Sequence, residues 1–264
     1  VWWVRRLYAL TTPNTTAATN RRERRILVFI KNLFYSYMTQ DEFFKRYKYD
    51  LTSDKIGTGA PGSVYKAFDT VGNRYIALKI SEVKSGGEKK QNLPDELSLS
   101  GEQAGHRNVA KYESVHTFQL PSGTYDFAVM PFYPSGNLNT LLQNNITDQK
   151  SRESIAIQLL DGLEFLHQHG IIHRNLKPSN ILMEVDTTGE ETVFIPKIAD
   201  FSLSKLSDPD NKNRFEGTTL QYSSPEQLKG EQLRFNTDLW SWAVISYLLL
   251  TGKELFASDS GQGE

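Results

Sequence analysis

Apolar residues recur at intervals of three and four between positions 151 and 169, and this spacing predicts an amphipathic helix. The apolar positions are Ile155, Leu159, Leu160, Leu163, Phe165 and Leu166. Gly170 is expected to end the helix, because glycine readily adopts the left-handed conformation that follows helix C-termini. Shorter apolar runs predict strands over residues 74–80 and 194–198. A third run, residues 125–131, indicates a buried strand followed by a turn at Pro134-Ser135-Gly136.

The composition sets broad limits without naming a function. The chain has 264 residues, of which 38% are hydrophobic and 23% charged, and these are ordinary values for a globular domain. The net charge of −1 gives no sign of nucleic-acid binding. The absence of cysteine excludes disulfides and thiolate metal sites, and it fits the reducing cytosol.

Candidate chemistry begins with a glycine-rich segment and a lysine inside an apolar run. Gly57, Gly59, Gly62 and Val64 fit the pattern G-x-G-x-x-G-x-V, in which missing Cβ atoms let the backbone approach phosphate. Taken alone, the pattern describes an ordinary glycine-rich hairpin turn equally well. Lys79 interrupts the strand predicted over residues 74–80, and a buried lysine is costly unless its charge is paired.

Further motifs follow in a fixed order. They are His173-Arg174-Asn175 with Lys177 and Asn180, then Asp200-Phe201-Ser202, then Ser224-Pro225-Glu226, and finally Asp238-Leu239-Trp240-Ser241. Together with the glycine-rich segment and Lys79, they resemble the eukaryotic-type Ser/Thr protein kinase family from about residue 50 to the C-terminus. Lys177, which precedes a proline, points to the Ser/Thr branch rather than the tyrosine kinases.

The resemblance implies an α+β fold of two lobes. A small antiparallel β lobe with one helix is expected over about residues 50–131, and a hinge over about 131–136. A mainly α-helical large lobe, incomplete at its end, is expected over about 137–264. Residues 38–264 would form the kinase domain, and residues 1–37 an N-terminal extension.

The resemblance also assigns a site for ATP and Mg²⁺. The nucleotide-binding positions would be Gly57, Gly59, Gly62, Val64, Ala77, Lys79, Met130, Pro131, Tyr133 and Asn137. Met130 would be the gatekeeper, the backbone of Pro131 and Tyr133 would read adenine, and Asn137 would lie near the ribose. Asn180 and Asp200 would bind Mg²⁺, since hard oxygen ligands suit that ion. Asn175, Lys177, Lys79 and Glu96 would form the catalytic group; Glu96 is the expected partner of Lys79, and Glu102 is the alternative.

Three departures from the family pattern bear on activity. Asn175 stands where the family has the aspartate that accepts the substrate proton, and an amide has no ionisable carboxylate. Loss of a general base costs about 10²–10⁴ in rate. Ser202 replaces a glycine of the metal-binding loop, and Pro61 removes one backbone N–H from the phosphate loop. His173 is expected to be packed rather than catalytic, and Asp238 to cap backbone N–H groups of the loop at residues 173–175.

Three functional hypotheses remain open. The first is a Ser/Thr protein kinase of reduced activity, which acts on protein hydroxyls. The second is a nucleotide-binding pseudokinase that serves as a scaffold or allosteric partner, and the third is an incomplete product without independent function. A cytoplasmic location and a protein substrate or regulatory partner are expected, without nucleic acid or a membrane span.

Both ends of the chain carry hypotheses of their own. Residues 1–37 precede the first methionine, Met38, and have no sustained period, so they are interpreted as upstream sequence translated in frame. A basic amphipathic membrane tether is the alternative. The family's large lobe continues beyond residues 240–250, so Glu226 is expected to lack its usual arginine. Part of the helix containing Val244, Ile245, Leu248 and Leu249 is expected to be exposed.

Overall fold

The computed structural model describes residues 38–59, 62–83, 105–144, 148–200, 205–206 and 220–256. By its internal contacts the chain divides into two units, Val1–Glu42 and Phe43–Glu264. In the first unit, the described residues open helix α3 (Gln40–Arg46). Thr39 and Glu42 form a reciprocal cap there, because the Thr39 N–H donates to the Glu42 carboxylate and the Glu42 N–H donates to the Thr39 hydroxyl. The domain boundary expected at residues 37 and 38 stays a prediction.

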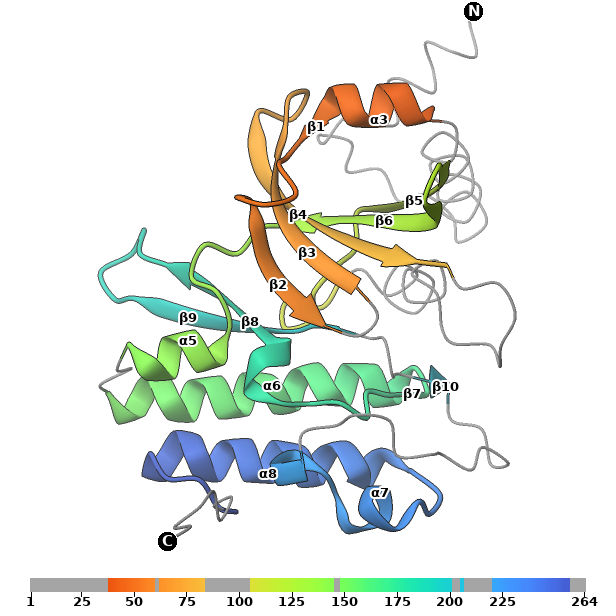
Figure 1. Cartoon of the computed structure of the whole chain (residues 1–264). Coiled ribbons are helices and arrows are strands. Elements are labelled where there is room, and N and C mark those ends of the chain that lie inside the picture. The colour runs from red at the N-terminus through yellow and green to blue at the C-terminus, as the bar shows by residue number, and fades with distance from the viewer. Residues whose placement is uncertain are drawn as a thin grey trace, which may run out of the picture. The chain divides into compact units, whose positions relative to one another are not determined.

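The second unit begins with an antiparallel sheet, seen in Figure 1 as the strands labelled β1 to β6. The strands are β1 (Tyr47–Lys48), β2 (Lys55–Gly59), β3 (Gly62–Asp69), β4 (Arg74–Glu82), β5 (Ser114–Leu120) and β6 (Gly123–Pro131). Their order is β1-β3-β4-β6-β5, with β2 paired to β3. The strand predicted over residues 74–80 is β4, and the one predicted over residues 125–131 is β6, so both are confirmed.

The pairing register separates the two faces of this sheet. Ala77 lies opposite Met130, and Lys79 lies opposite Ala128, so these four side chains share one face. The other face carries a buried aromatic group around Phe43. Its rings contact that of Phe43 at centroid distances of 4.8 to 5.5 Å and belong to Phe44, Tyr47, His116, Phe118 and Phe127.

A salt bridge ties the C-terminal end of α3 to the turn between β3 and β4. Arg46 donates from Nε and Nη2 to the two carboxylate oxygens of Asp69, each at 2.8 Å. Asp69 also accepts hydrogen bonds from the N–H groups of Val71 and Gly72, which shapes the turn. The hydrogen bond from Arg46 is the main reason that the pKa of Asp69 is lowered to about 2.

The rest of the unit is mainly helical. It comprises α5 (Leu138–Gln143), α6 (Gln149–Gln168), β7 (Ile171–Ile172), η1 (Pro178–Asn180), β8 (Ile181–Asp186), β9 (Val193–Ile198), β10 (Lys205–Leu206), η3 (Leu220–Tyr222), α7 (Pro225–Lys229) and α8 (Phe235–Thr251). Helices α6 and α8 lie side by side in Figure 1, and Trp242 of α8 donates its indole N–H to the Ala156 carbonyl of α6 at 2.8 Å. The mixture of antiparallel strands and helices confirms the α+β class.

The core between these helices largely follows the predicted apolar stripe of α6. Ile155, Leu159, Leu163 and Leu166 are buried in one cluster with Ile245 and Leu249 of α8. Leu160 is 37% exposed, contrary to its place in the stripe, because it follows the buried Leu159 by about 100° around the helix. On α8, Val244 is also buried, and the part of the helix that is exposed, as expected, carries Leu239, Trp240, Tyr247 and Leu250.

Candidate functional site

The loop between β7 and η1 is anchored by one buried carboxylate. Asp238, in the first turn of α8, accepts hydrogen bonds from the N–H groups of His173 and Arg174, both at 2.8 Å. His167 of α6 lies 2.9 Å from the same carboxylate through Nε2. The prediction that Asp238 caps the loop backbone is therefore confirmed.

His173 is a structural residue of this loop. Its side chain is fully buried, Nε2 lies 3.0 Å from the Ala199 carbonyl, and Nδ1 accepts the N–H of Asn175 at 3.3 Å. These two contacts require the neutral ring with its proton on Nε2. Burial lowers the pKa of His173 and outweighs the opposing effect of Asp238, so the ring stays neutral, as expected of a packed residue.

Asn175 and Asn180 are linked through the loop backbone. The side-chain N–H of Asn180 donates to the Asn175 carbonyl at 2.8 Å, and the Asn180 carbonyl accepts the N–H of Ala199 at 2.9 Å. These bonds place Asn180 beside the residue that precedes Asp200. Within the described ranges, neither the Asn175 side-chain amide nor the Asn180 Oδ1 has a hydrogen-bond partner, so both remain available to a ligand.

Lys79 of β4 forms an ion pair with Asp200, which follows β9. Lys79 Nζ lies 3.2 Å from Asp200 Oδ1, and Lys79 is only 7% exposed. From the sequence we predicted Glu96 as the partner of Lys79, with Glu102 as the alternative. Both glutamates lie outside the described residues, so this prediction is not tested. No local pattern points to the pair of Lys79 and Asp200, because 121 residues separate its members.

Two residues of this site hold an unusual backbone conformation. Arg174 and Asp200 have positive φ angles of 68° and 64°, although neither is a glycine. Non-glycine residues avoid this left-handed region, and each instance costs about 1–3 kcal/mol that the surrounding contacts must offset. The hydrogen bonds around the loop are therefore part of what fixes the site.

The glycine-rich segment forms the hairpin of β2 and β3, with Gly57 opposite Val64 and Gly59 opposite Gly62. A Cβ added to Gly62 would lie 2.0 Å from the Ile80 carbonyl oxygen of β4, which is a severe clash. One added to Gly57 would lie 3.8 Å from its nearest neighbour. Gly62 is thus required by the approach of β4, a reason that the motif alone did not reveal. Pro61 lies outside the described residues.

The segment predicted as the hinge leaves β6 and enters α5. Met130 is half-buried against the main core, and Pro131 ends β6. The Tyr133 carbonyl accepts the N–H of Gly136 at 3.0 Å, and burial raises the pKa of the Tyr133 phenol to about 12. Asn137 caps α5 through a hydrogen bond that its Oδ1 accepts from Thr140 at 3.1 Å. Its side-chain oxygen is therefore engaged in the cap.

The donor set can be tested against the chemistry of Mg²⁺ and ATP. Asn180 Oδ1 and the Asp200 carboxylate, which is 33% exposed, are hard oxygen donors on adjoining backbone segments, and Lys79 supplies a positive charge beside Asp200. The described residues include no group of three or more His, Cys, Asp or Glu able to hold a metal alone. Two protein oxygens suit an ion whose other ligands are phosphates and water. These residues fit the pair of cofactors.

The end of the segment before α8 holds contacts that the motifs did not indicate. Glu226, expected to lack an arginine, has its Oε1 2.8 Å from the Thr237 hydroxyl and 3.3 Å from the Asn236 side-chain N–H. Gln227, which no motif singled out, donates to the Arg174 carbonyl at 2.7 Å. Lys177 lies between Leu176 and η1 and is half-buried. Ser202, Thr218 and Thr219 lie outside the described residues.

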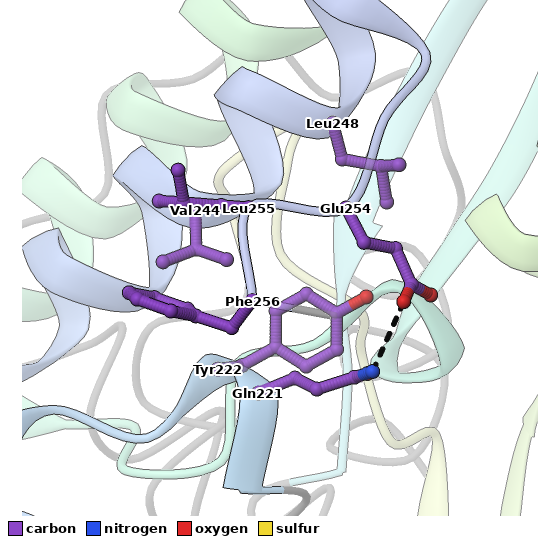
Figure 2. Close-up of a pocket in the computed structure, with 7 residues that line it drawn as sticks. All are labelled: Gln221, Tyr222, Val244, Leu248, Glu254, Leu255 and Phe256. Carbon is purple, nitrogen blue, oxygen red and sulfur yellow. Dashed lines mark hydrogen bonds between the residues drawn. The ribbon is translucent and has the colours of Figure 1, made fainter. Parts of the chain in front are cut away.

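A separate small pocket lies between η3, α8 and residues 254–256 (Figure 2). Its walls are Tyr222, Val244, Leu248, Leu255 and Phe256, with Gln221 and Glu254 joined by a hydrogen bond of 3.1 Å. None of the predicted site residues lines this pocket. In the described part of the chain, no helix has the length and apolar character needed to cross a membrane.

Comparison with known proteins agrees with this geometry. The family model "Protein kinase domain" matches residues 51–264. Myosin light chain kinase 3 of Homo sapiens is 31% identical over 215 residues, which cover 78% of this chain and 24% of that protein. Serine/threonine-protein kinase atg1 of Dictyostelium discoideum is 30% identical over 212 residues, covering 78% and 31% respectively. A titin homolog of Caenorhabditis elegans is 28% identical over 211 residues, covering 79% and 1%.

The chain spans less than a third of the length of each of these three relatives. The family match, in contrast, extends over most of the chain and includes the hairpin, the Lys79 and Asp200 pair and the anchored loop. The chain belongs to the protein kinase family.

Proposed function

We propose that this chain binds ATP with Mg²⁺ and transfers the γ-phosphate to Ser or Thr hydroxyls of proteins, at a reduced rate. The observation that carries the proposal is the ion pair between Lys79 and Asp200, together with the backbone hydrogen bond that joins Asn180 to Ala199, the residue before Asp200. It brings together, from three distant segments, one cation and two oxygen donors of the kind that phosphoryl transfer requires. The printed names of the relatives, among them a serine/threonine-protein kinase, support the Ser/Thr assignment.

Each residue of the site would have a distinct part. Lys79 would lie against phosphate oxygens and offset their charge, while Asp200 and Asn180 would bind the metal. When bound, Mg²⁺ and ATP would supply an activated phosphoryl group with its charge partly neutralised. The backbone of the hinge at Pro131 and Tyr133 would face adenine, and the hairpin at Gly57, Gly59 and Gly62 would cover the phosphates.

Asn175 limits the chemistry at the acceptor. Its amide could orient a substrate hydroxyl by hydrogen bonding, but it cannot take up the proton. Positioning and electrostatics supply much of the rate of phosphoryl transfer, so activity is expected to be lowered rather than abolished. The amide at Asn175, which cannot accept a proton, also favours a second candidate function, a nucleotide-binding pseudokinase that acts through a protein partner.

Nucleotide binding is the test that both candidates share. Mg-ATP at 100 times its Kd should raise the free energy of unfolding by about 2.7 kcal/mol, measured as a thermal shift. Lys79→Ala should abolish this shift. The matched control is Lys197→Ala, whose lysine pairs with Glu184 instead, and this variant should keep it. A folded protein that shows no shift with Mg-ATP would contradict both functions.

A further inference from the structure

The peptide bond between Arg174 and Asn175 is held from both sides. Its carbonyl accepts a hydrogen bond of 2.7 Å from the Gln227 side chain, and its N–H donates to the His173 ring at 3.3 Å. The preceding N–H, that of Arg174, donates to Asp238. Gln227 thus holds the carbonyl group of the peptide bond between Arg174 and Asn175.

The amide of Gln227 has a fixed orientation. Gln227 is the third residue of α7, and its Oε1 accepts the Ser224 N–H at 3.0 Å while Ser224 Oγ accepts the Gln227 N–H at 3.3 Å. This reciprocal cap turns the side-chain oxygen toward Ser224 and the N–H₂ group toward Arg174. Gln227 is 7% exposed, so water does not readily replace the contact.

Because Arg174 has a left-handed conformation, the orientation of the following peptide bond depends on hydrogen bonds such as the one from Gln227. A φ of 68° is unfavourable for arginine, so the peptide on its C-terminal side would turn away if its hydrogen bonds were lost. A turn of that peptide would move Asn175, the residue that would face the acceptor hydroxyl. The Asn180 side chain would lose its place too, because it donates to the Asn175 carbonyl.

We propose that Gln227 is a positioning residue, which sets the placement of Asn175 through the Arg174 carbonyl. The inference rests on the proposed function, because Asn175 is taken as the residue at the acceptor hydroxyl. It also makes helix α7, at the end of the segment that contains Ser224-Pro225-Glu226, a support for the loop at residues 173–175. A displacement of α7 would be transmitted to the loop through this side chain.

The substitution Gln227→Glu separates the two roles of the side chain. The introduced carboxylate still accepts the Ser224 N–H, as glutamate does in most caps of this kind, but it has no hydrogen to donate to the Arg174 carbonyl. The control is Ser224→Ala, which removes one half of the cap and leaves the amide of Gln227 in place. Both variants should be studied in the Asn175→Asp background, where transfer is expected to be faster than in the parent.

Two readouts test the inference. Hydrogen exchange in a peptide spanning residues 173–180 should be about tenfold faster in Gln227→Glu and unchanged in Ser224→Ala. The kcat for a generic Ser/Thr peptide should fall about tenfold in Gln227→Glu, because the turned peptide moves both Asn175 and Asn180.

Equal exchange in Gln227→Glu and the parent, or equal acceleration in both variants, would show that Gln227 only stabilises α7 and would overturn the proposal. If the buried carboxylate prevents folding, Gln227→Met, which is uncharged and of similar length, replaces it with the same expected exchange. A background without transfer activity would contradict the proposed function alone, since the exchange measurement still decides the role of Gln227.

Discussion

At the scale of single residues, the backbone of Asn175 contributes to the fold of the loop, whereas its side chain is free to take part in the reaction. Its backbone is held by His173 and by Asn180, whereas its side-chain amide has no hydrogen-bond partner among the residues that the structure describes. The geometry of the loop therefore does not depend on which polar group this side chain carries. A change of its chemistry should alter the reaction and leave the fold intact.

Asn175→Asp should raise the rate of phosphorylation of a generic Ser/Thr substrate by about 10²-fold or more, because it restores a proton acceptor. The measurement is the initial rate at saturating Mg-ATP, with Asn175→Ala as the control that lacks both the amide and the carboxylate. If Asn175→Asp and the parent are equally inactive in a folded protein that binds ATP, the pseudokinase function is the correct one. If the parent is already as fast as the variant, proton removal contributes little here.

At the scale of elements, the glycines in the hairpin of β2 and β3 differ in how strictly the fold requires them. Gly62 is needed because β4 approaches closely at the Ile80 carbonyl, while the space around Gly57 would accept a Cβ. The sequence predicted β4, β9 and α6 well, because their apolar patterns are local. It could not predict which strand presses on Gly62, or that Gln227 reaches Arg174 across 53 residues, since both depend on chain segments far apart.

Gly62→Ala should destabilise the free protein by about 1–3 kcal/mol, since the added Cβ forces β3 away from β4. Gly57→Ala is the matched control in the same loop, and its free energy of unfolding should stay close to that of the parent. Chemical denaturation without nucleotide measures both. Equal stability of the two variants would mean that β4 yields at Ile80 without cost.

At the scale of the whole second unit, stability should depend on pH through its buried aromatic group. Burial lowers the pKa of His116 to about 4 from 6.5, and the nearby charge of Arg46 acts in the same direction. The folded form therefore prefers the neutral ring. This preference stabilises the fold fully above pH 6.5, and it is lost as the pH falls toward 4, because the unfolded chain binds the proton first.

The free energy of unfolding should accordingly fall by about 3 kcal/mol at most between pH 6.5 and 4 on account of His116. In His116→Gln, which can still bond to Ser114 but does not titrate, the decline should be smaller. His169→Gln, at an exposed histidine, should keep the decline of the parent. Asp69 acts at lower pH, because its folded pKa of about 2 lies below the ordinary value of 3.8. Identical pH profiles for all three proteins would contradict the role of His116.

The aromatic group and the Arg46 bridge were not foreseen from the sequence. The rings come from α3, β1, β5 and β6, and no periodic pattern joins these segments. Asp238 was foreseen, because a motif resemblance carries information about distant contacts that apolar periodicity does not. The remaining site predictions, from Gly57 to Asp200, stay proposals about ligands that binding measurements must decide.

The position of Asp238 in the chain affects the order in which the loop is synthesised and stabilised. The carboxylate that holds the N–H of His173 lies 65 residues further along the chain, so the ribosome makes the loop long before it makes the anchor. Domains generally fold as units while they are translated. Until the start of α8 has left the ribosome, the loop lacks its two backbone hydrogen bonds to Asp238, and we expect it to be open to proteases and chaperones. A nascent chain stalled before residue 238 should thus be cleaved at the loop, and one stalled well after it should resist.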